Sequence, residues 1–486
     1  MGGLFGVAAK DDCKMDVFYG TDYHSHLGTM FGGMAVNRGK GLKNKIHDIR
    51  DSQFRTKLGP DLDSLRGNYS GIGVISDFDA QPLVIESHLG RYAIATVGVI
   101  RNINELKREA FRRRTAHFTD RAGDEVSPTE LIASLINQEG SFEDGIAYAQ
   151  QTIEGSCTML LLTEKGVYAA RDRFGRTPIV IGKREESKRR AAAFAAASES
   201  CSFPTLDFQV QNFLGPGEVA LITQDGVEQR RKPNPKMSVC SFLWVYYGFP
   251  ASDYEWINTE DARNRCGAAL ARADKADRES GKLNVDFVAG IPDSGTGHAI
   301  GYADEANLPY RRPFTKYTPT WPRSFMPQDQ SIRELVAEMK LIPIEALIRG
   351  KSLLFCEDSI VRGTQLRDNV DILFELGAEE VHMRPACPPL VYACRYLNFS
   401  RSRALKDLAG IRAIHSLEGL RDEQEVTIDM VRNYSEEHPE NFDRVVDWIR
   451  KDLHLTTLRY QKLDDLVKAI GVPKERSCTY CWDAQG

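Results

Sequence analysis

The segment Leu353–Thr364, which reads LLFCEDSIVRGT, limits the fold of this 486-residue chain more than any other stretch. Four apolar residues lead into two adjacent acids, and the acids lead into a short loop with one arginine and one glycine. A second apolar run, within VDFVAGIPDSG, also ends in a glycine-bearing loop, and an alanine-rich segment of helical character follows. A strand, a loop and a helix in this order are typical of βαβ units, so a parallel sheet is expected in the second half.

The residues after the first of these loops have helical spacing. Leu366, Val370, Leu373 and Leu376 fall on one helical stripe, and Gly377 follows just past its end. A further strand candidate, EEVHMRPA, comes next. The order strand, loop, helix and strand completes one βαβ unit.

The first half of the chain has a different pattern. It contains many short β-like runs, such as YAIATVGVI, TMLLL, GVYAARD and EVALIT, so we expect sheets with interspersed helices. The segment Arg230–Lys236, RRKPNPK, combines charge with two prolines and is the best candidate for a domain boundary. The chain is too long for one core, and we expect domains at residues 1–235 and 236–486.

Composition and charge exclude several classes of protein. The net charge of −5 gives no global basic field of the kind that non-specific nucleic-acid binding requires. No apolar run approaches the roughly 18 residues of a membrane span, and the N-terminus has no signal-peptide layout. We therefore expect a cytoplasmic protein without nucleic-acid or membrane partners, in which the ten cysteines are reduced.

The acids and the loop after them suit a particular kind of ligand. Open parallel sheets bind ligands at the carboxyl ends of their strands. Glu357 and Asp358 would place two carboxylates there, suited to ribose hydroxyls or, through water, to Mg²⁺. Backbone N–H groups and hydroxyls of Ser359–Thr364, at the start of the next helix, suit a phosphate. The alternative is an ordinary helix start with solvated acids.

The loop Ile291–Gly297, IPDSGTG, could take a second anionic group, although alone it would be read as a tight turn. Together the two loops resemble the pyrophosphate loop and the phosphoribosylpyrophosphate (PRPP) motif of the glutamine PRPP amidotransferase family, the first enzymes of purine synthesis. The resemblance extends over nearly the whole chain, through GRTP, ASESC, PGEVALI and LWVYYGFP.

This resemblance implies an α+β layer sandwich of the N-terminal-nucleophile glutaminase type, followed by an α/β type I phosphoribosyltransferase domain with a parallel sheet. It also implies a homotetramer that purine nucleotides regulate.

The resemblance further implies a role for each residue of the two loops. KYTPTWPRSFMPQDQ is similar to the family's flexible loop, which places Lys316 and Arg323 on the pyrophosphate, and MKLIP places Lys340 at a family lysine. Lys316, Arg323 and Asp358 are the implied catalytic residues. The implied PRPP-binding set is Asp293, Ser294, Gly295, Thr296, Lys340, Glu357, Asp358, Ser359, Ile360, Val361, Arg362, Gly363 and Thr364, with Mg²⁺ on Ser294, Glu357 and Asp358.

Four cysteines match positions that bind a [4Fe–4S] cluster in some members of the family. They are Cys240 before an aromatic segment, Cys394 after a double proline, and the C-terminal pair Cys478 and Cys481. The spacing of that pair alone suits a metal or a redox site. Thiolates suit zinc as well as iron, and the resemblance favours the iron–sulfur cluster.

The glutaminase half departs from the family at four places that its chemistry uses. Gly2 stands where the family has its nucleophilic cysteine, Val97 replaces the oxyanion-hole asparagine, and Pro128 replaces the aspartate that reads the glutamine amine. GVISDFD, residues 73–79, replaces the segment whose arginine anchors the glutamine carboxylate. Cys13, the nearest thiol in sequence, offers no sign of a replacement site.

The sequence therefore predicts a PRPP-dependent phosphoribosyltransferase without glutaminase activity. Its nucleophile would be ammonia, giving phosphoribosylamine, or another small amine. A subunit that binds PRPP or nucleotides without turnover is the alternative. Glu357 and Gln365 differ from the usual family residues and are compatible with PRPP binding.

Overall fold

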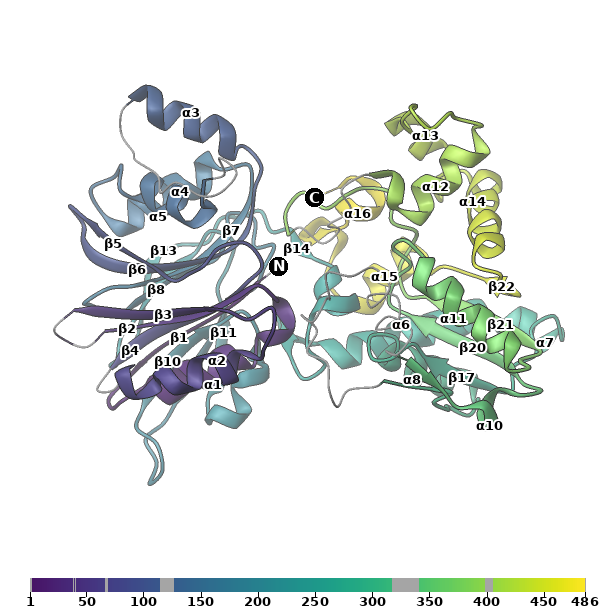
Figure 1. Ribbon diagram of the computed structural model, residues 1–486, viewed down its shortest axis with the longest axis horizontal. Helices are drawn as coiled ribbons and strands as arrows, with labels where there is room; N and C mark the ends of the chain where they lie inside the picture. The colour runs from purple at the N-terminus through teal and green to yellow at the C-terminus, as the bar shows by residue number, and fades with distance from the viewer. Residues whose placement is uncertain are drawn as a thin grey trace.

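The computed structural model describes residues 2–37, 39, 41–65, 69–113, 126–316, 341–397 and 405–485. Arg323 and Lys340 lie outside this part of the chain. Figure 1 shows two bodies side by side, with the first half of the chain in one and the second half in the other.

The first body contains two packed antiparallel sheets. The seven-stranded sheet has the order β11-β9-β10-β1-β4-β2-β3, with β1 Gly2–Ala9, β2 Phe31–Asn37, β3 Leu42–Asp48, β4 Ser70–Ser76, β9 Val180–Arg184, β10 Ala193–Ala197 and β11 Gln209–Phe213. The six-stranded sheet has the order β13-β12-β8-β7-β6-β5, with β5 Leu83–Ser87, β6 Gly90–Ile100, β7 Gly155–Leu162, β8 Val167–Ala170, β12 Val219–Ile222 and β13 Val227–Arg231.

Helices cover the outer faces of these sheets (Figure 1). The seven-stranded sheet carries α1 Lys14–Asp22 and α2 Phe54–Leu58, and the other sheet carries α3 Ile103–Arg113, α4 Pro128–Ile136 and α5 Phe142–Thr152. In β1, Leu4 and Ala8 face the core between the sheets, whereas Phe5 and Val7 face the helix layer. Because both faces of the strand are buried, its sequence reads as a continuous apolar run.

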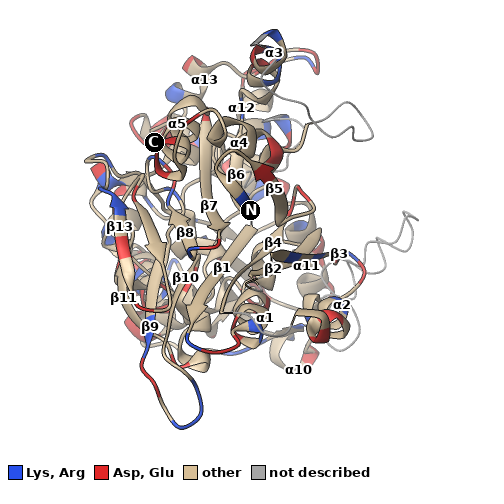
Figure 2. Ribbon diagram, turned by 90° about the vertical axis from the view of Figure 1, so that its left-hand side faces the viewer, with Lys and Arg blue, Asp and Glu red and all other residues tan. Residues whose placement is uncertain are grey.

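Charged residues concentrate on the edges of the sheets. In Figure 2 the ribbon of the edge strand β13 is coloured at acidic and basic residues, whereas the central strands β1 and β7 contain no charged residues. Charge on an edge strand opposes pairing with another chain, and apolar central strands supply the core.

The second body contains the expected parallel sheet. Its order is β17-β20-β21-β22, with β17 Phe287–Gly290, β20 Ser352–Glu357, β21 Glu380–Pro385 and β22 Thr457–Leu458. The helices α6 Thr259–Ala273 and α8 Thr296–Ala306 pack on one face, and α11 Thr364–Glu375 packs on the other. The predicted stripe is confirmed in α11, where Val370 and Leu373 are buried and Gly377 follows with φ +89°.

Smaller elements complete this half. They are β15 Asp253–Tyr254, β16 Ile257–Asn258, α7 Lys275–Glu279, β18 Phe314–Lys316, β19 Leu341–Pro343, α10 Glu345–Ile348, α12 Ala409–Leu417, α13 Ile428–Asn433, α14 Pro439–Asp452, α15 Leu463–Ile470 and α16 Tyr480–Asp483. Two short strands, β14 Val239–Cys240 and β23 Ser477–Cys478, pair in parallel and bring the C-terminal segment back to the start of the second half. None of the described helices has the length and apolarity to cross a membrane.

A buried neutral histidine gives the first half a testable dependence on pH. His24 lies under β1, and its Nδ1 is 2.7 Å from Gly20 O, while the Glu199 backbone N–H donates to its Nε2 at 3.2 Å. Burial lowers the pKa of His24 from 6.5 to about 4. The unfolded chain therefore binds a proton between these values that the folded chain does not bind, and folding stability should fall as pH falls through this window.

Between pH 7 and pH 4, protonation linked to His24 should lower the unfolding free energy of the unaltered protein by up to about 3 kcal/mol. We expect this part of the pH dependence to be absent in His24→Gln. Urea unfolding at several pH values measures this slope. The matched control is His88→Gln, because His88 is exposed and should leave the slope unchanged. If the unfolding free energy of His24→Gln fell with pH as steeply as that of the unaltered protein, the prediction would be wrong.

Candidate functional site

The two loops predicted from sequence lie at one edge of the parallel sheet. Gly290 at the end of β17 pairs with Cys356 near the end of β20, and the Ile291 N–H donates to Cys356 O at 3.1 Å. The Ser294 hydroxyl donates to Glu357 Oε1 at 3.0 Å. The carboxyl ends of two adjacent strands thus bring together residues that are 63 positions apart.

Glycine is required where these loops approach the sheet. A Cβ on Gly295 would lie 2.2 Å from Cys356 O, so no other residue fits there without backbone movement. Gly363 precedes α11 with φ +82°, in the left-handed region that favours glycine.

Of the two acids at the end of β20, Asp358 is buried and Glu357 is half-buried, and neither has an ion-pair partner within 4 Å among the described residues. Burial raises the pKa of Asp358 to about 6, and burial together with the adjacent Asp358 raises the pKa of Glu357. The Asp358 N–H donates to Glu357 Oε1 at 2.9 Å, and the Ser359 hydroxyl donates to Asp358 Oδ1 at 3.0 Å. Two adjacent carboxylates without a cation beside them suit a metal ion or several hydroxyl groups.

The loop after the acids presents backbone donors. No hydrogen-bond acceptor among the described residues receives the N–H groups from Ile360 to Thr364. Its carbonyls are engaged, since Val361 O accepts from Ala409 N at 2.8 Å and Arg362 O accepts from the Arg412 side chain at 2.8 Å. Backbone donors at the start of a 12-residue helix form a cradle for a phosphate.

The other side of the site contains an ion pair between Lys316 and Asp293. Lys316, at the end of β18, places Nζ 2.7 Å from Asp293 Oδ2. Thr296 begins α8, directly after the loop. The carboxyl ends of β17 and β20 therefore bring together three parts of the predicted site, namely Asp293 to Thr296, Lys316, and Glu357 to Thr364. The predicted partners Arg323 and Lys340 lie outside the described residues.

The four predicted cysteine ligands lie in one region. Cys240 and Cys478 are opposite each other in the β14–β23 pair, and the Val391 and Tyr392 N–H groups donate to Cys481 O at 3.1 and 3.2 Å. These two hydrogen bonds hold the segment that contains Cys394 next to Cys481. The Leu397 N–H donates to the Sγ of Cys394 at 3.4 Å. All four thiols are free of disulfides.

These thiols influence one another. Burial raises the pKa of Cys240, and Cys478 and Cys394 add to this effect. A hydrogen bond with Cys394, followed by burial, raises the pKa of Cys481. Burial raises the pKa of Cys478 and Arg176 opposes that effect. Nevertheless, no three His, Cys, Asp or Glu side chains of the described chain converge as a preformed metal site.

In the first half, the region of the expected glutaminase pocket is nearly filled. A cavity of about 10 Å³, enough for about one water, remains between the halves. It is lined by Gly2, Leu27, Val97, Thr177, Pro178, Ser198, Glu199, Leu243 and Tyr254. A Cβ on Gly2 would lie 2.7 Å from both Val97 Cγ1 and Ile75 O, so Val97 occupies the space that a side chain at position 2 would need.

The segment GVISDFD forms part of a closed polar network. Asp79 is buried and accepts from the Ser127 hydroxyl at 2.9 Å and from Thr129 N at 3.0 Å, at the start of α4. Pro128 is the first residue of that helix. Gln81 bridges Ser76 and the backbone of Thr96. These groups are satisfied internally.

Two residues of the region between the halves have roles that the sequence did not indicate. Glu199, within ASESC, is buried and lines the cavity, and Arg176, within GRTP, is buried against Cys478. Both segments contributed to the resemblance, but no local pattern signals burial against another domain. Cys13 is fully buried, and burial raises the pKa of its thiol, which does not favour a nucleophile.

Known proteins resemble this chain over most of its length. Residues 71–203 match the glutamine amidotransferase domain family. Amidophosphoribosyltransferase of Bacillus subtilis is 29% identical over 87% of this chain and 85% of its own. The enzyme of Archaeoglobus fulgidus is 30% identical over 74% of this chain and 75% of its own.

A solved structure matches both halves of the chain. Glutamine PRPP amidotransferase from Bacillus subtilis, in complex with ADP and GMP, has a TM-score of 0.78 at 25% identity and covers 99% of this chain and 96% of its own. The expected fold class, a glutaminase-like layer sandwich followed by a phosphoribosyltransferase sheet, is thereby confirmed. The chain belongs to the amidophosphoribosyltransferase family.

Proposed function

We propose that this protein displaces pyrophosphate from C1 of PRPP with ammonia or another small amine, and that it does not hydrolyse glutamine. The observation that supports the first part most strongly is the contact between Ser294 and Glu357, which unites an anion loop and a carboxylate pair. PRPP contains a ribose between a 5′-phosphate and a 1′-pyrophosphate, and the strand edge offers a matching group for each.

The roles of the residues follow from their chemistry. Glu357 and Asp358 bind the ribose hydroxyls, and Ile360 to Thr364 donate backbone N–H groups to the 5′-phosphate. Asp293 to Thr296, with Lys316, Arg323 and Lys340, bind the pyrophosphate. Mg²⁺, held by Ser294, Glu357 and Asp358, would neutralise charge on the leaving group. The amine attacks C1 as the bond from C1 to the pyrophosphate oxygen breaks, and positioning and charge neutralisation supply most of the rate enhancement.

Three observations support the loss of glutaminase activity. The chain has Gly2 rather than a thiol, Val97 fills the adjacent space, and Asp79 and Gln81 form hydrogen bonds within the protein. The cavity that remains has room for about one water, which is far too small for glutamine. The nitrogen therefore comes from solution as ammonia or an amine.

A regulatory subunit that binds PRPP or nucleotides without turnover is the second candidate. The solved Bacillus subtilis relative contains ADP and GMP, so nucleotide binding has a precedent in that protein. A homotetramer and control by purine nucleotides remain predictions from the resemblance.

We also propose that Cys240, Cys394, Cys478 and Cys481 hold a [4Fe–4S] cluster. These four cysteines form no disulfides and lie in one mostly buried region, with a cation and a backbone N–H directed at two of the sulfurs. These groups fit an anionic thiolate centre better than neutral thiols. The cluster would link the two ends of the second half covalently.

We expect PRPP to bind in the presence of Mg²⁺, and ammonium at alkaline pH to release pyrophosphate from it. Asp358→Asn should weaken binding, because a hydrogen bond to a charged group is typically worth about 1.5–3 kcal/mol. Calorimetry measures binding, and a coupled pyrophosphate assay measures turnover. Glu380→Gln is the matched control, since Glu380 begins β21 at the opposite end of the same sheet.

Binding without turnover for any amine would favour the regulatory subunit. Absence of PRPP binding would contradict the proposal altogether.

We expect no glutamine hydrolysis, with or without PRPP, and Gly2→Cys should not restore it. That substitution should lower the melting temperature, since overpacking typically costs about 1–3 kcal/mol. Val97→Ala added to Gly2→Cys should recover part of this loss, because it removes one of the two close contacts. Glutamate release assays and thermal unfolding test these outcomes, and protein-dependent glutamate release by any of the three proteins refutes the claim.

Protein purified without oxygen should contain about four iron and four sulfide per chain. Replacement of any of the four cysteines by serine should prevent assembly and lower the melting temperature. Cys266→Ser, at a buried thiol outside this region, is the matched control. Zinc in place of iron in the anaerobic protein would disprove the assignment.

A further inference from the structure

Arg176 is a buried arginine of the first half that contacts a cysteine of the second half. It follows β8 in the chain, and only 2% of its surface is exposed. Its Nη1 donates to Cys478 Sγ at 2.9 Å and lies 3.4 Å from the Ser238 hydroxyl. Its guanidinium lies 3.3 Å from the centroid of the Tyr396 ring, and its carbonyl accepts from Cys240 N at 3.1 Å.

The positive charge of Arg176 has no matching carboxylate. Among the described residues no carboxylate oxygen lies within 4 Å of the guanidinium, and its buried Nε has no hydrogen-bond partner. Asp172 is near enough to feel its charge, but the Asp172 oxygens accept from Phe174 N and Thr177 N. A buried cation without an anion is costly, so the site lacks a negative partner.

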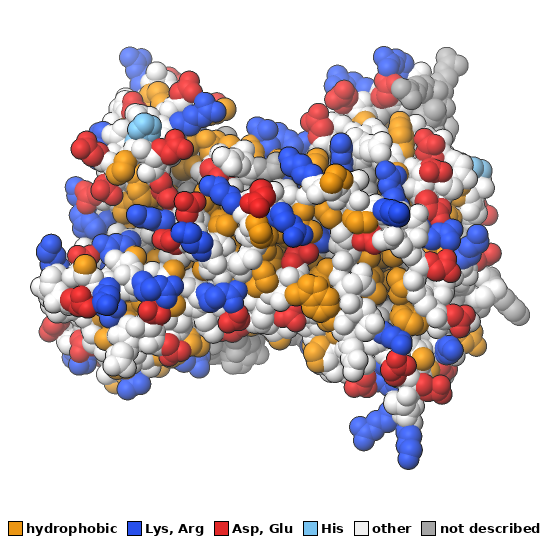
Figure 3. All heavy atoms as spheres, turned by 180° about the vertical axis from the view of Figure 1, so that it is seen from behind, with side chains coloured by type: hydrophobic (Ala, Val, Ile, Leu, Met, Phe, Trp, Pro, Cys, Tyr) orange, Lys and Arg blue, Asp and Glu red, His pale blue; other side chains and the backbone are white. Residues whose placement is uncertain are grey.

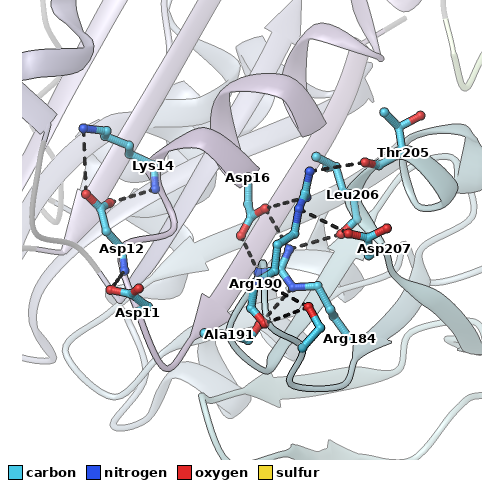
Figure 4. A network of polar contacts seen from close by, with 11 residues as sticks. Asp11, Asp12, Lys14, Asp16, Arg184, Arg190, Ala191, Thr205, Leu206 and Asp207 are labelled. Atoms are coloured by element: carbon cyan, nitrogen blue, oxygen red, sulfur yellow. Dashed lines mark hydrogen bonds and ion pairs between the residues drawn. The ribbon is translucent and has the colours of Figure 1, made fainter.

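Two other buried arginines of the first half are each paired with a carboxylate. Arg184 donates to both oxygens of Asp16 at 2.8 and 2.7 Å (Figure 4). Arg171 lies 2.7 Å from Glu255. Arg176 differs from both because the group directed at it is a sulfur rather than a carboxylate.

We propose that Arg176 is the counter-ion of the cysteine-held cluster and that the first half supplies it across the domain boundary. The inference rests on the iron–sulfur cluster proposed above. Four thiolates give such a centre net negative charge, which supplies the anion that Arg176 lacks. Arg176 is a positioning residue, because it acts through Cys478 and touches neither PRPP nor the amine.

Two consequences follow from this placement. A hydrogen bond and a positive charge at a cluster sulfur stabilise the reduced, more negative form and raise the reduction potential. Formation of the cluster also stabilises the docking of the first half on the second, since the buried cation gains its partner only when the thiols have ionised and bound iron.

The test compares Arg176→Met, Arg176→Gln and Arg184→Met with the unaltered full-length protein, all purified anaerobically. A dithionite titration followed by electron paramagnetic resonance gives the potential of the one-electron reduction. Arg176→Met should lower the ratio of reduced to oxidised cluster about tenfold at the wild-type midpoint, which corresponds to about 59 mV. Arg176→Gln keeps a donor without the charge and should give an intermediate potential. Arg184→Met should leave the potential unchanged.

Thermal unfolding supplies a second readout that a merely structural arginine would not give. Arg176→Met should lower the melting temperature of the cluster-loaded protein but not of the chelator-treated protein, in which the cation has no partner. Arg184→Met should lower both equally, because it leaves Asp16 buried and unpaired.

The outcomes separate the two proposals. Absence of iron from the unaltered protein would overturn the cluster proposal and this inference with it. Iron in all variants with an unchanged potential would overturn only the role of Arg176. If Arg176→Met does not accumulate as folded protein, the potential of Arg176→Gln decides in the same way.

Discussion

One buried carboxylate, that of Glu199, is shared by both halves of the molecule. It accepts hydrogen bonds from the hydroxyls of Tyr254 and Ser252 in the second half, and His26 of the first half lies 3.0 Å away. Burial opposes its ionisation, yet His26, His24 and Tyr254 together lower the pKa of Glu199 to about 2. The charge is therefore retained at all ordinary pH values, and separation of the halves would leave several buried polar groups without partners.

This interface accounts for the small space that remains beside Gly2. Figure 3 shows the two halves in contact across their middle, and Leu243 and Tyr254 of the second half line the small cavity beside Gly2. Val97 lines the cavity on the side of the first half, and Leu243 and Tyr254 line it on the side of the second. Voids in a packed interior are destabilising, and here Val97 fills the space beside Gly2 while the polar groups of Asp79 are satisfied by hydrogen bonds within the protein.

Much of the fold was predictable because its signals are local. The apolar run Leu353–Cys356, the stripe through Val370 and Leu373 and the glycine at 377 each follow from the periodicity of one element, and all three predictions agree with the structure. The resemblance implied that Ser294 and Glu357 share a ligand, and their contact agrees with the way parallel sheets gather loops at the carboxyl ends of their strands.

The contacts between distant segments were not predictable. The β14–β23 pair has two residues in each strand and joins segments more than 230 positions apart, so neither strand has a period to detect. The burial of Glu199 and Arg176 likewise depends on how two domains dock. Charged residues are rarely fully buried, so the sequence alone predicts that Glu199 and Arg176 are exposed to solvent.

The same contacts make the two halves depend on each other. Three charged side chains of the first half are buried at the interface, with Glu199 against Tyr254, Arg171 against Glu255 and Arg176 against Cys478. Each places a charged group of the first half in the interior beside the phosphoribosyltransferase half, where deletion of one partner is costlier than replacement of both. Of these contacts, only that of Arg171 with Glu255 joins two opposite charges, and removal of a partner from any of the three leaves a buried charge less well compensated. The interface is therefore where substitutions in the first half cost most.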